Sequence, residues 1–531
     1  MREHGSRNTF VYRAVLTAVI MLQVIAAFYF CARKQGFHYD EYYSYYSSNV
    51  SSGLAPSDCE WMNRDDIMDE FMVIKGEGFN YGMVRIMQTY DVHPPVYYYV
   101  LHTVCSLTPG VFSKWQGLAV NLIFYVMGIV MLWMIADIVS RGDKKADVFT
   151  VALFGFSPAI ISGVVFIRMY VMLTFMCQLY IYIHLRAIRD KRFDIKHFDI
   201  PVFILTFITA GIHYYGIVFM FFVALYMFFH LLIDSSTRKK AFTYAVSVFL
   251  GLAAFLLSYP AAAGHILHSY RGTEAQAAFF DIQNMADRAG LFVGMLNEYL
   301  LHGSFYILIL VVLLIYATGR YRRTIEHTPR DHENYMLRLI CVTAFGYFFV
   351  VYKTALTNAE EAVRYEMPVY GLIIFLTVYA IMACRIEMSE AIGRIIYPAK
   401  VTLLSVAVIL QLVALYQSKV VFLYEQDKTS YEWAESHSDD TIVYIYNPNN
   451  QWMIWDDSME LMQYERIFFV SMDGEEKITD TDITGASHMY VYTVRGDVAM
   501  DRLNDIMEAD GNDHNAEKVR ELQYVDIYEI R

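Results

Sequence analysis

Acidic and basic side chains stand at the ends of long apolar stretches in this chain, where they could carry chemistry. Asp40 and Glu41 come first, shortly after an apolar stretch over 10–31 and within the run Phe37-His38-Tyr39-Asp40-Glu41-Tyr42-Tyr43. Tyrosines there are typical of a membrane interface, but an interfacial belt does not explain two acids. A partly desolvated carboxylate binds a proton more tightly and suits general-base catalysis. A solvated loop charge is the competing interpretation, and the residues alone leave both open.

Asp91 and His93 form a second polar pair, directly before a Pro-Pro dipeptide. Helix capping explains them well, because an aspartate can accept backbone N–H groups while proline occupies the first helical turn. Capping is compatible with function, since a helix start also offers positive potential to a phosphate. The pattern predicts a short helix within 94–110, which Pro109-Gly110 ends.

Cations and aromatic residues gather at further span ends. Such cations usually extend to the interface, and a histidine in a turn can simply be satisfied there. Arginines on the outer face are nevertheless the exception under the positive-inside rule, and an arginine can bind a lipid phosphate bidentately. The candidate phosphate-binding residues are Arg168, Tyr170, His213, Tyr214, Lys353, Arg364 and Tyr365.

The composition indicates a polytopic α-helical membrane protein. The chain has 531 residues, of which 56% are hydrophobic, against about 45–50% in soluble proteins. Residues 423–531 hold 25 acidic and 8 basic residues, hence −17, and the rest is +4 because the total is −13. A mildly basic membrane part with an acidic tail argues against nucleic acid as a partner. The six cysteines show no zinc-ligand spacing.

Eleven apolar stretches are candidate membrane spans, each approaching the roughly 20 residues that a crossing needs. The basic N-terminus leads into the first, which we expect to be retained. The stretches are 10–31, 117–137, 147–166, 168–187, 198–213, 215–233, 241–260, 298–318, 337–353, 366–384 and 400–422.

Lysine and arginine in five short loops predict the orientation. Arg2, Arg7 and Arg13 predict a cytoplasmic N-terminus. All five loops then fall on the cytoplasmic side, and the first loop (32–114) and the C-terminal region lie outside. Residues 94–110 then cannot cross once, so we expect them at the outer interface; a twelfth crossing is the alternative. The loop charges are Arg141, Lys144 and Lys145; Arg186, Arg189, Lys191 and Arg192; Arg238, Lys239 and Lys240; Arg320, Arg322 and Arg323; and Arg385 and Arg394.

The C-terminal region changes character at about residue 423. β-Branched and aromatic runs predict strands, and helical spacing predicts two helices between them. We therefore expect a membrane domain over 1–422 and a small accessory α/β domain over 423–531. The predicted strands are 441–447, 466–473, 488–494 and 521–530, and the predicted helices are 452–465 and 498–510.

Together these motifs resemble the GT-C glycosyltransferases, especially the protein O-mannosyltransferase and aminoarabinose-transferase branch. Members carry an Asp-Glu pair after the first span and an Asp-x-His-Pro-Pro stretch before an apolar helix. The Gly-Lys that follows in the mannosyltransferases is absent, and the resemblance covers roughly 10–385. The matching residues are Asp40-Glu41, Asp91-Val92-His93-Pro94-Pro95, Ser157-Pro158, Arg168-Met169-Tyr170, His213-Tyr214 and Arg364-Tyr365 with Pro368.

The resemblance implies inverting transfer of a sugar from a polyprenyl-phosphate donor to an extracytoplasmic glycan, lipid or protein acceptor. Asp40 would be the general base, and Glu41, Asp91 and His93 would orient the acceptor or the loop. Arg168 and Arg364, with His213 or Lys353 as further candidates, would stabilise the leaving phosphate. No cofactor is implied; a divalent ion at the carboxylates of residues 40 and 91 stays open.

A lipid-linked sugar transporter or flippase is the first alternative, and a glycan polymerase is the second. A transporter needs charged residues within its spans, facing a cavity. The predicted spans are almost free of charge, and the polar residues collect on one face. This asymmetry favours an enzyme that works at one membrane interface.

Overall fold

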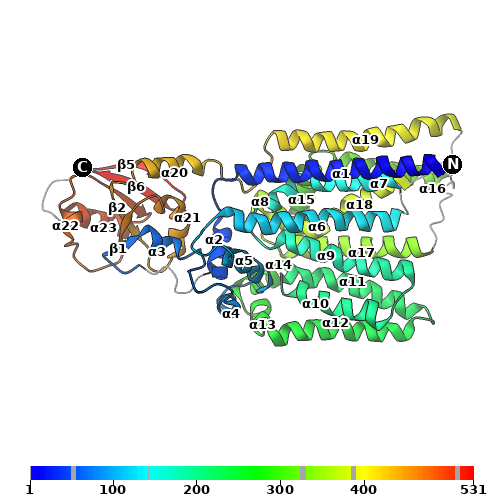
Figure 1. The fold of residues 1–531 in the computed structure, drawn as a ribbon, viewed down its shortest axis with the longest axis horizontal. Coiled ribbons are helices and arrows are strands. Elements are labelled where there is room, and N and C mark those ends of the chain that lie inside the picture. The colour runs from blue at the N-terminus through cyan, green and yellow to red at the C-terminus, as the bar shows by residue number, and fades with distance from the viewer. Residues whose placement is uncertain (1, 50–55, 141–142, 323–330, 384–389, 509–514) are drawn as a thin grey trace. The chain divides into compact units, whose positions relative to one another are not determined.

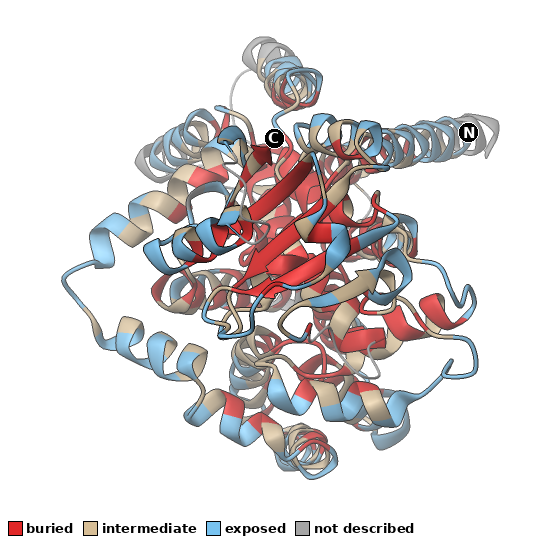
Figure 2. Cartoon of the chain, turned by 90° about the vertical axis from the view of Figure 1, so that its left-hand side faces the viewer, coloured by how far each residue is buried: buried red, intermediate tan, exposed pale blue. Residues whose placement is uncertain are grey.

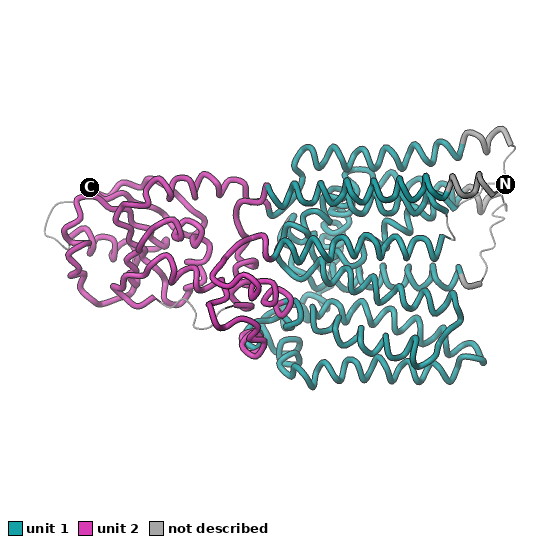
Figure 3. The backbone as a smooth tube through the Cα atoms, in the orientation of Figure 1, with its two compact units in different colours: residues 1–32, 88–97, 117–422 teal, residues 33–87, 98–116, 423–531 magenta. Residues whose placement is uncertain are grey.

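The computed structural model describes residues 2–49, 56–140, 143–322, 331–383, 390–508 and 515–531. Outside them lie Arg141, Arg323, Arg385, part of the first loop, and the ends of the predicted segments 366–384 and 498–510. The chain divides into two compact units (Figure 3). Unit 1 comprises 1–32, 88–97 and 117–422, and unit 2 comprises 33–87, 98–116 and 423–531.

Unit 1 is helical, and its long helices lie side by side (Figure 1). Three short π- or 3₁₀-helices join them: η1 (Ile195–Asp199), η2 (Leu296–Leu300) and η3 (Ala359–Arg364). The α-helices are α1 (Arg2–Arg33), α6 (Lys114–Ser140), α7 (Lys144–Gly155), α8 (Pro158–Val165), α9 (Tyr170–Asp190), α10 (Ile200–Ala210), α11 (Tyr214–Ile233), α12 (Arg238–Ser258), α13 (Ala261–Leu267), α14 (Tyr270–Phe280), α15 (Met285–Met295), α16 (Phe305–Arg322), α17 (Asp331–Thr354), α18 (Met367–Ala383) and α19 (Glu390–Tyr416).

Within the described residues, seven helices are long and apolar enough to cross a membrane, or nine if two bent pairs each count as one span. This confirms the helical, multi-pass class, whereas the number eleven stays a prediction. The stretch 147–166 is one of the bent pairs, because α7 and α8 meet at 50°. Pro158 occupies the first turn of α8, and a proline cannot continue the preceding helix.

Helix α5 (Val96–Ser106) confirms the short helix expected within 94–110. Its 11 residues extend about 17 Å at 1.5 Å per residue, well short of the roughly 30 Å of a hydrocarbon core. The backbone N–H of Val96 donates to the carbonyl of Gly211 at 2.9 Å, which ties the start of α5 to the end of α10.

Unit 2 contains a six-stranded sheet with the order β1-β3-β2-β4-β6-β5. Strand β2 pairs in parallel with both β3 and β4, and the other pairs are antiparallel. The central strands are buried (Figure 2), as their continuous apolar sequences require. The strands are β1 (Glu60–Asn63), β2 (Thr441–Tyr446), β3 (Arg466–Ser471), β4 (Met489–Val494), β5 (Ala516–Glu521) and β6 (Val525–Ile530).

The small C-terminal sheet expected from the sequence is confirmed, but two of its strands were not foreseen. Strand β1 comes from the first loop and pairs with β3. Strand β5 precedes the predicted stretch 521–530, which the structure divides between the end of β5 and β6. The first loop therefore contributes an edge strand to the sheet.

The helices of unit 2 flank this sheet, and one of them carries the Asp-Glu pair. Helix α2 contacts α21 through Trp455, whose ring lies 4.7 Å from those of Tyr43 and Tyr46. The C-terminal region thus supports the helix that begins with Asp40. The helices are α2 (Tyr39–Asn49), α3 (Arg64–Met68), α20 (Asp427–Ser436), α21 (Trp452–Leu461), α22 (Thr481–Thr484) and α23 (Asp497–Glu508), and α4 (Tyr81–Tyr90) lies within the first loop.

Candidate active site

Seven of the predicted site residues gather in unit 1, and we call them the arginine–histidine cluster. Its members come from four separate places in the chain, at the starts of helices or in the turns before them. They are Asp91, His93, Arg168, Tyr170, His213, Arg364 and Tyr365.

A polar chain runs from Asp91 through His93 to Arg168. Oδ2 of Asp91 lies 3.2 Å from Nδ1 of His93, and Nη2 of Arg168 lies 3.4 Å from Nδ1 and 3.5 Å from Nε2. An ionised aspartate only accepts hydrogen bonds, so the hydrogen of the contact between Asp91 and His93 is on Nδ1 of His93.

The charge on Asp91 is stabilised by this chain. Burial alone would raise the pKa of its carboxyl. The charge and hydrogen bond of His93, the charge of Arg168 and the N–H of Val92 outweigh burial and hold that pKa well below its ordinary value. Asp91 therefore stays ionised at neutral pH.

Arg168 is held at the break between α8 and α9 rather than extended to solvent. Its side chain is buried, and its backbone N–H donates to the carbonyl of Phe166 at 2.7 Å. Nδ2 of Asn121, on α6, donates to the same carbonyl at 2.6 Å and to that of Val164 at 3.1 Å. Asn121 thus fixes the turn that presents Arg168. The sequence reasoning missed it, although an amide inside an apolar stretch was a signal.

His213 caps the start of α11, and its ring lies near those of His93 and Tyr170. Its Nδ1 accepts the backbone N–H of Tyr215 at 3.0 Å, which is the capping bond. Its ring centroid lies 5.5 Å from that of His93 and 5.6 Å from that of Tyr170. Burial, followed by the charges of His93 and the two arginines, holds the pKa of His213 well below its ordinary value. His213 is therefore neutral and cannot itself neutralise a phosphate.

Arg364 lies within aromatic rings at the end of η3. Its guanidinium carbon is 4.9 Å from the centroid of Phe166, 5.1 Å from Tyr365 and 6.0 Å from Tyr170. Its Nη2 donates to the hydroxyl of Tyr365 at 3.2 Å. Such rings stabilise a cation that has lost most of its water.

Two tyrosine hydroxyls fix the backbone that carries Arg364. Tyr347 donates to the carbonyl of Tyr365 at 2.9 Å, and Tyr370 donates to the carbonyl of Val363 at 2.8 Å. Both donors are fully buried and come from α17 and α18. The position of Arg364 is therefore set by the helices around it rather than by its own short 3₁₀-helix.

Tyr214 and Lys353 hydrogen-bond elsewhere. The hydroxyl of Tyr214 lies 2.9 Å from Nδ1 of His265, on α13. The ammonium group of Lys353 is buried and donates to the backbone carbonyl of Asp281. Their predicted contact with phosphate stays a prediction.

Glu366 is a buried acid beside Arg364 in the chain that the sequence reasoning did not assign. Its side chain is fully buried, and neither carboxyl oxygen has a hydrogen-bond partner among the described residues. A buried charge without a partner is costly, so this environment favours the neutral acid.

Asp40 and Glu41 belong to unit 2, where they occupy the first turn of α2. Oε2 of Glu41 accepts the ammonium of Lys34 at 2.8 Å and the backbone N–H of His38 at 2.7 Å, and both charged side chains are 0% exposed. These two contacts of Glu41 stabilise the start of α2. The Asp40 side chain is 20% exposed, and its Oδ2 lies 3.7 Å from Nδ1 of His38. Of the pair, Asp40 is the one whose side chain is partly exposed.

The described residues contain no group of three or more histidine, cysteine, aspartate or glutamate side chains arranged to hold a metal ion. No cofactor-binding motif was expected from the sequence either. The role of a divalent ion at Asp40 or Asp91 stays open.

The sequence matches no protein-family model and no curated protein. The structure matches ArnT from Cupriavidus metallidurans bound to undecaprenyl phosphate, with a TM-score of 0.53 and 10% identity over 97% of each chain. The apo state of the same protein gives a TM-score of 0.45 at 10% identity, over 92% of this chain and 96% of that one. An oligosaccharyltransferase from Archaeoglobus fulgidus gives a TM-score of 0.48 at 13% identity, over 90% of this chain and 69% of that one.

The likeness to ArnT extends over nearly the whole of both chains. At this identity it establishes the fold and leaves the activity to be argued from the residues. The other two resemblances lie below a TM-score of 0.5 and add nothing to the assignment. The chain therefore has the GT-C fold that its sequence predicts.

Proposed function

We propose that this protein is a membrane glycosyltransferase that moves a sugar from a polyprenyl-phosphate donor to an acceptor hydroxyl outside the membrane. The observation that carries the proposal is the arginine–histidine cluster. It contains two buried arginines and one ionised aspartate, and its buried His213 is neutral. Buried guanidinium groups held in place close to one another suit the binding of an anion.

A phosphate is the anion that this geometry suits best. Guanidinium groups recognise phosphate oxygens through paired N–H donors, and both arginines are held in place by neighbouring backbone or rings. The aromatic side chains around Arg364 are themselves buried, so they hold its guanidinium group in place. The fold supports the same choice, since the ArnT structure of this fold contains undecaprenyl phosphate.

The reaction would be a single displacement with inversion. The acceptor oxygen forms a bond to the anomeric carbon while the bond from that carbon to the phosphate oxygen breaks. The phosphate leaves with the electron pair, and Arg168 and Arg364 stabilise its charge. The acceptor proton passes to Asp40, whose position in the first turn of α2 favours its ionised form as a base.

Asp91 and His93 would act as positioning residues in this scheme. Their hydrogen bonds orient the segment before α5 and hold Arg168 toward His93. Glu41, paired with Lys34, would keep α2 in place so that Asp40 is presented correctly.

Mass spectrometry of envelope glycans would test the proposal in cells that lack the protein. We expect a sugar to disappear from one envelope component and to return when the wild-type chain is supplied. Asp40→Asn should fail to restore it, whereas Asp65→Asn, at an exposed acid of the same unit, should restore it. Unchanged glycans in cells that lack the protein would contradict the function. Full restoration by a folded Asp40→Asn protein would remove Asp40 as the base.

A further inference from the structure

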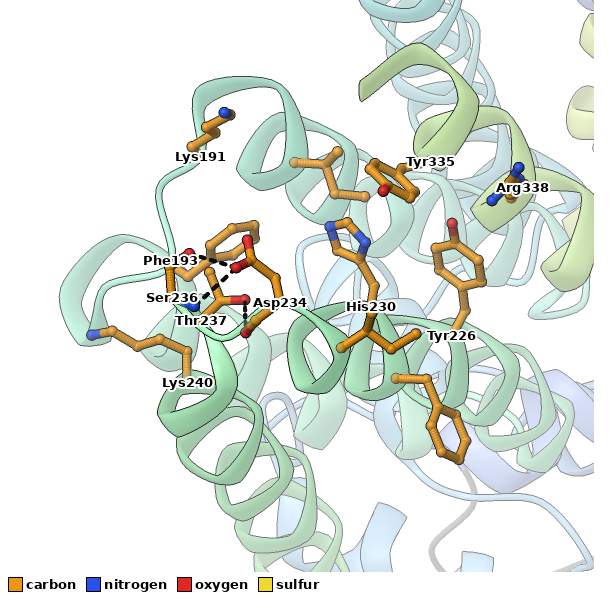
Figure 4. Close-up of a pocket in the computed structure, with 13 residues that line it drawn as sticks. Lys191, Phe193, Tyr226, His230, Asp234, Ser236, Thr237, Lys240, Tyr335 and Arg338 are labelled. Atoms are coloured by element: carbon orange, nitrogen blue, oxygen red, sulfur yellow. Dashed lines mark hydrogen bonds between the residues drawn. The ribbon is translucent and has the colours of Figure 1, made fainter. Parts of the chain in front are cut away.

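Unit 1 contains a second polar site, at the other end of α11 from His213. A pocket of about 540 Å³ lies there between the ends of α9 and α11 and the starts of α12 and α17 (Figure 4). Helix α11 has 20 residues and is about 30 Å long, which is the thickness of a hydrocarbon core. The pocket therefore lies at the opposite membrane face from the arginine–histidine cluster.

The pocket carries an excess of positive charge. Lys191, Lys240 and Arg338 line it, and Asp234 is its only lining carboxylate among the described residues. Asp234 is occupied within the turn between α11 and α12, where it accepts the backbone N–H and the hydroxyl of Ser236 at 2.9 and 2.8 Å. Asp234 and Asp199 interact electrostatically with Lys191 and Lys240, but the ion pairs of the described residues include none of the three cations. They are available to an external anion.

The same pocket exposes apolar and aromatic surface. Phe229 and Ile233 line it and are 50% and 79% exposed. The ring of Tyr335 lies 4.5 Å from that of His230 and 6.0 Å from the guanidinium carbon of Arg338. A soluble anion would use the cations alone, whereas a lipid would use both surfaces.

We propose that this pocket binds the headgroup of an anionic phospholipid. Lys191, Lys240 and Arg338 would contact the phosphate, and Phe229 and Ile233 would contact the first part of an acyl chain. Basic pockets between membrane helices are suited to such headgroups. The loops on this side carry the lysines and arginines that predict the cytoplasmic face, so the lipid would come from the inner leaflet. The site is independent of the proposed sugar transfer.

Native mass spectrometry of the full chain in mixed micelles would test this proposal, with phosphatidylglycerol as the probe and phosphatidylcholine as the neutral comparison. Each cation near an anionic lipid contributes about a fivefold change in binding. The double variant Lys240→Gln with Arg338→Gln should therefore bind phosphatidylglycerol about 30-fold more weakly. Binding of phosphatidylcholine should not change.

Lys196→Gln with Lys239→Gln is the matched control. It removes the same charge from exposed neighbouring positions that do not line the pocket, and it should lose less than about twofold. The single variant Lys191→Gln, with an expected fivefold loss, serves if the double variant does not fold. Equal losses in the pocket and control variants would overturn the proposal, as would displacement of phosphatidylglycerol by millimolar inorganic phosphate.

Discussion

Nη2 of Arg168 lies 3.5 Å from Nε2 of His93, although 75 residues separate them in the chain. This contact joins the segment before α5 to the break between α8 and α9. It also explains why an arginine is buried there, since the charge is shared with the chain that ends at Asp91. Two motifs that are distant in sequence therefore form one charged group.

Replacing Arg168 by lysine should lower sugar transfer by about 100-fold, the loss typical of removing one pre-organised charge donor. Lysine keeps the charge but loses the planar fork that can contact a phosphate and His93 together. The measurement is kcat/KM with a polyprenyl-phosphate sugar, on purified protein in nanodiscs. Arg186→Lys is the control, because that side chain is 61% exposed at the far end of α9. Wild-type kinetics in Arg168→Lys would exclude a phosphate role for this residue.

Asn121→Leu should destabilise the protein by about 1–3 kcal/mol. The carbonyl of Val164 loses its side-chain donor, and a buried unsatisfied group costs about 1–3 kcal/mol, whereas the carbonyl of Phe166 keeps the backbone N–H of Arg168. Activity should fall as well, because the turn that carries Arg168 loses its support. Thermal unfolding in detergent measures the first effect and sugar transfer the second.

Gln178→Leu is a matched control on α9. Its buried amide has no hydrogen-bond partner among the described residues, so its replacement by an apolar side chain of similar size should be neutral or stabilising. If both variants lost the same stability, the hydrogen bonds of Asn121 would not be the cause.

The sequence predicts which face of the membrane carries the site, and this orientation stays a prediction. It does not predict the contacts within the site. The positive-inside pattern places His93, Arg168 and Arg364 on one face, because charge asymmetry is a property of whole loops. A membrane face of a protein is tens of ångströms wide, so the location of two residues on the same face does not imply that His93 contacts Arg168. That contact requires the turn between α8 and α9 to place Arg168 beside His93, which are 75 residues apart in the chain.

The partners of the first loop were equally beyond local sequence patterns. Strand β1 has four residues and is defined only by its pairing with β3, and such short edge strands carry little propensity of their own. Glu41 was grouped with Asp40 because the two are adjacent. Their surroundings differ, because the ammonium of Lys34 pairs with the carboxylate of Glu41.

Unit 2 should lose stability as the pH rises from about 4 to about 7. Burial raises the pKa of Asp427 to about 6, and it raises that of Asp456 to about 6. The ordinary pKa of an aspartate is 3.8. Between pH 3.8 and about 6 the folded state therefore binds more protons than the unfolded chain. Stability from this source is complete below pH 3.8 and is lost as the pH passes 6.

Urea unfolding at several pH values, followed by tryptophan fluorescence, would measure this dependence. Five of the six tryptophans belong to unit 2, and only Trp133 belongs to unit 1. The fluorescence signal therefore reports mainly on unit 2. Asp427→Asn, which cannot ionise, should remove up to about 3 kcal/mol of the pH dependence. Asp439→Asn, at an exposed acid of the same unit, should leave the slope unchanged. A slope that Asp427→Asn does not alter would show that other groups are responsible.

Glu41→Gln should destabilise unit 2 by about 3–5 kcal/mol, because it removes the carboxylate that pairs with the fully buried ammonium of Lys34. The glutamine can still accept the N–H of His38, so the change isolates the charge from the helix-capping bond. Lys34→Met combined with Glu41→Gln should recover most of the loss, since neither charge then remains. Sugar transfer should recover with it, because Asp40 is intact and α2 is again supported. If the double variant is stable but inactive, Glu41 or Lys34 takes part in the reaction itself, and the division of roles between Asp40 and Glu41 would be wrong.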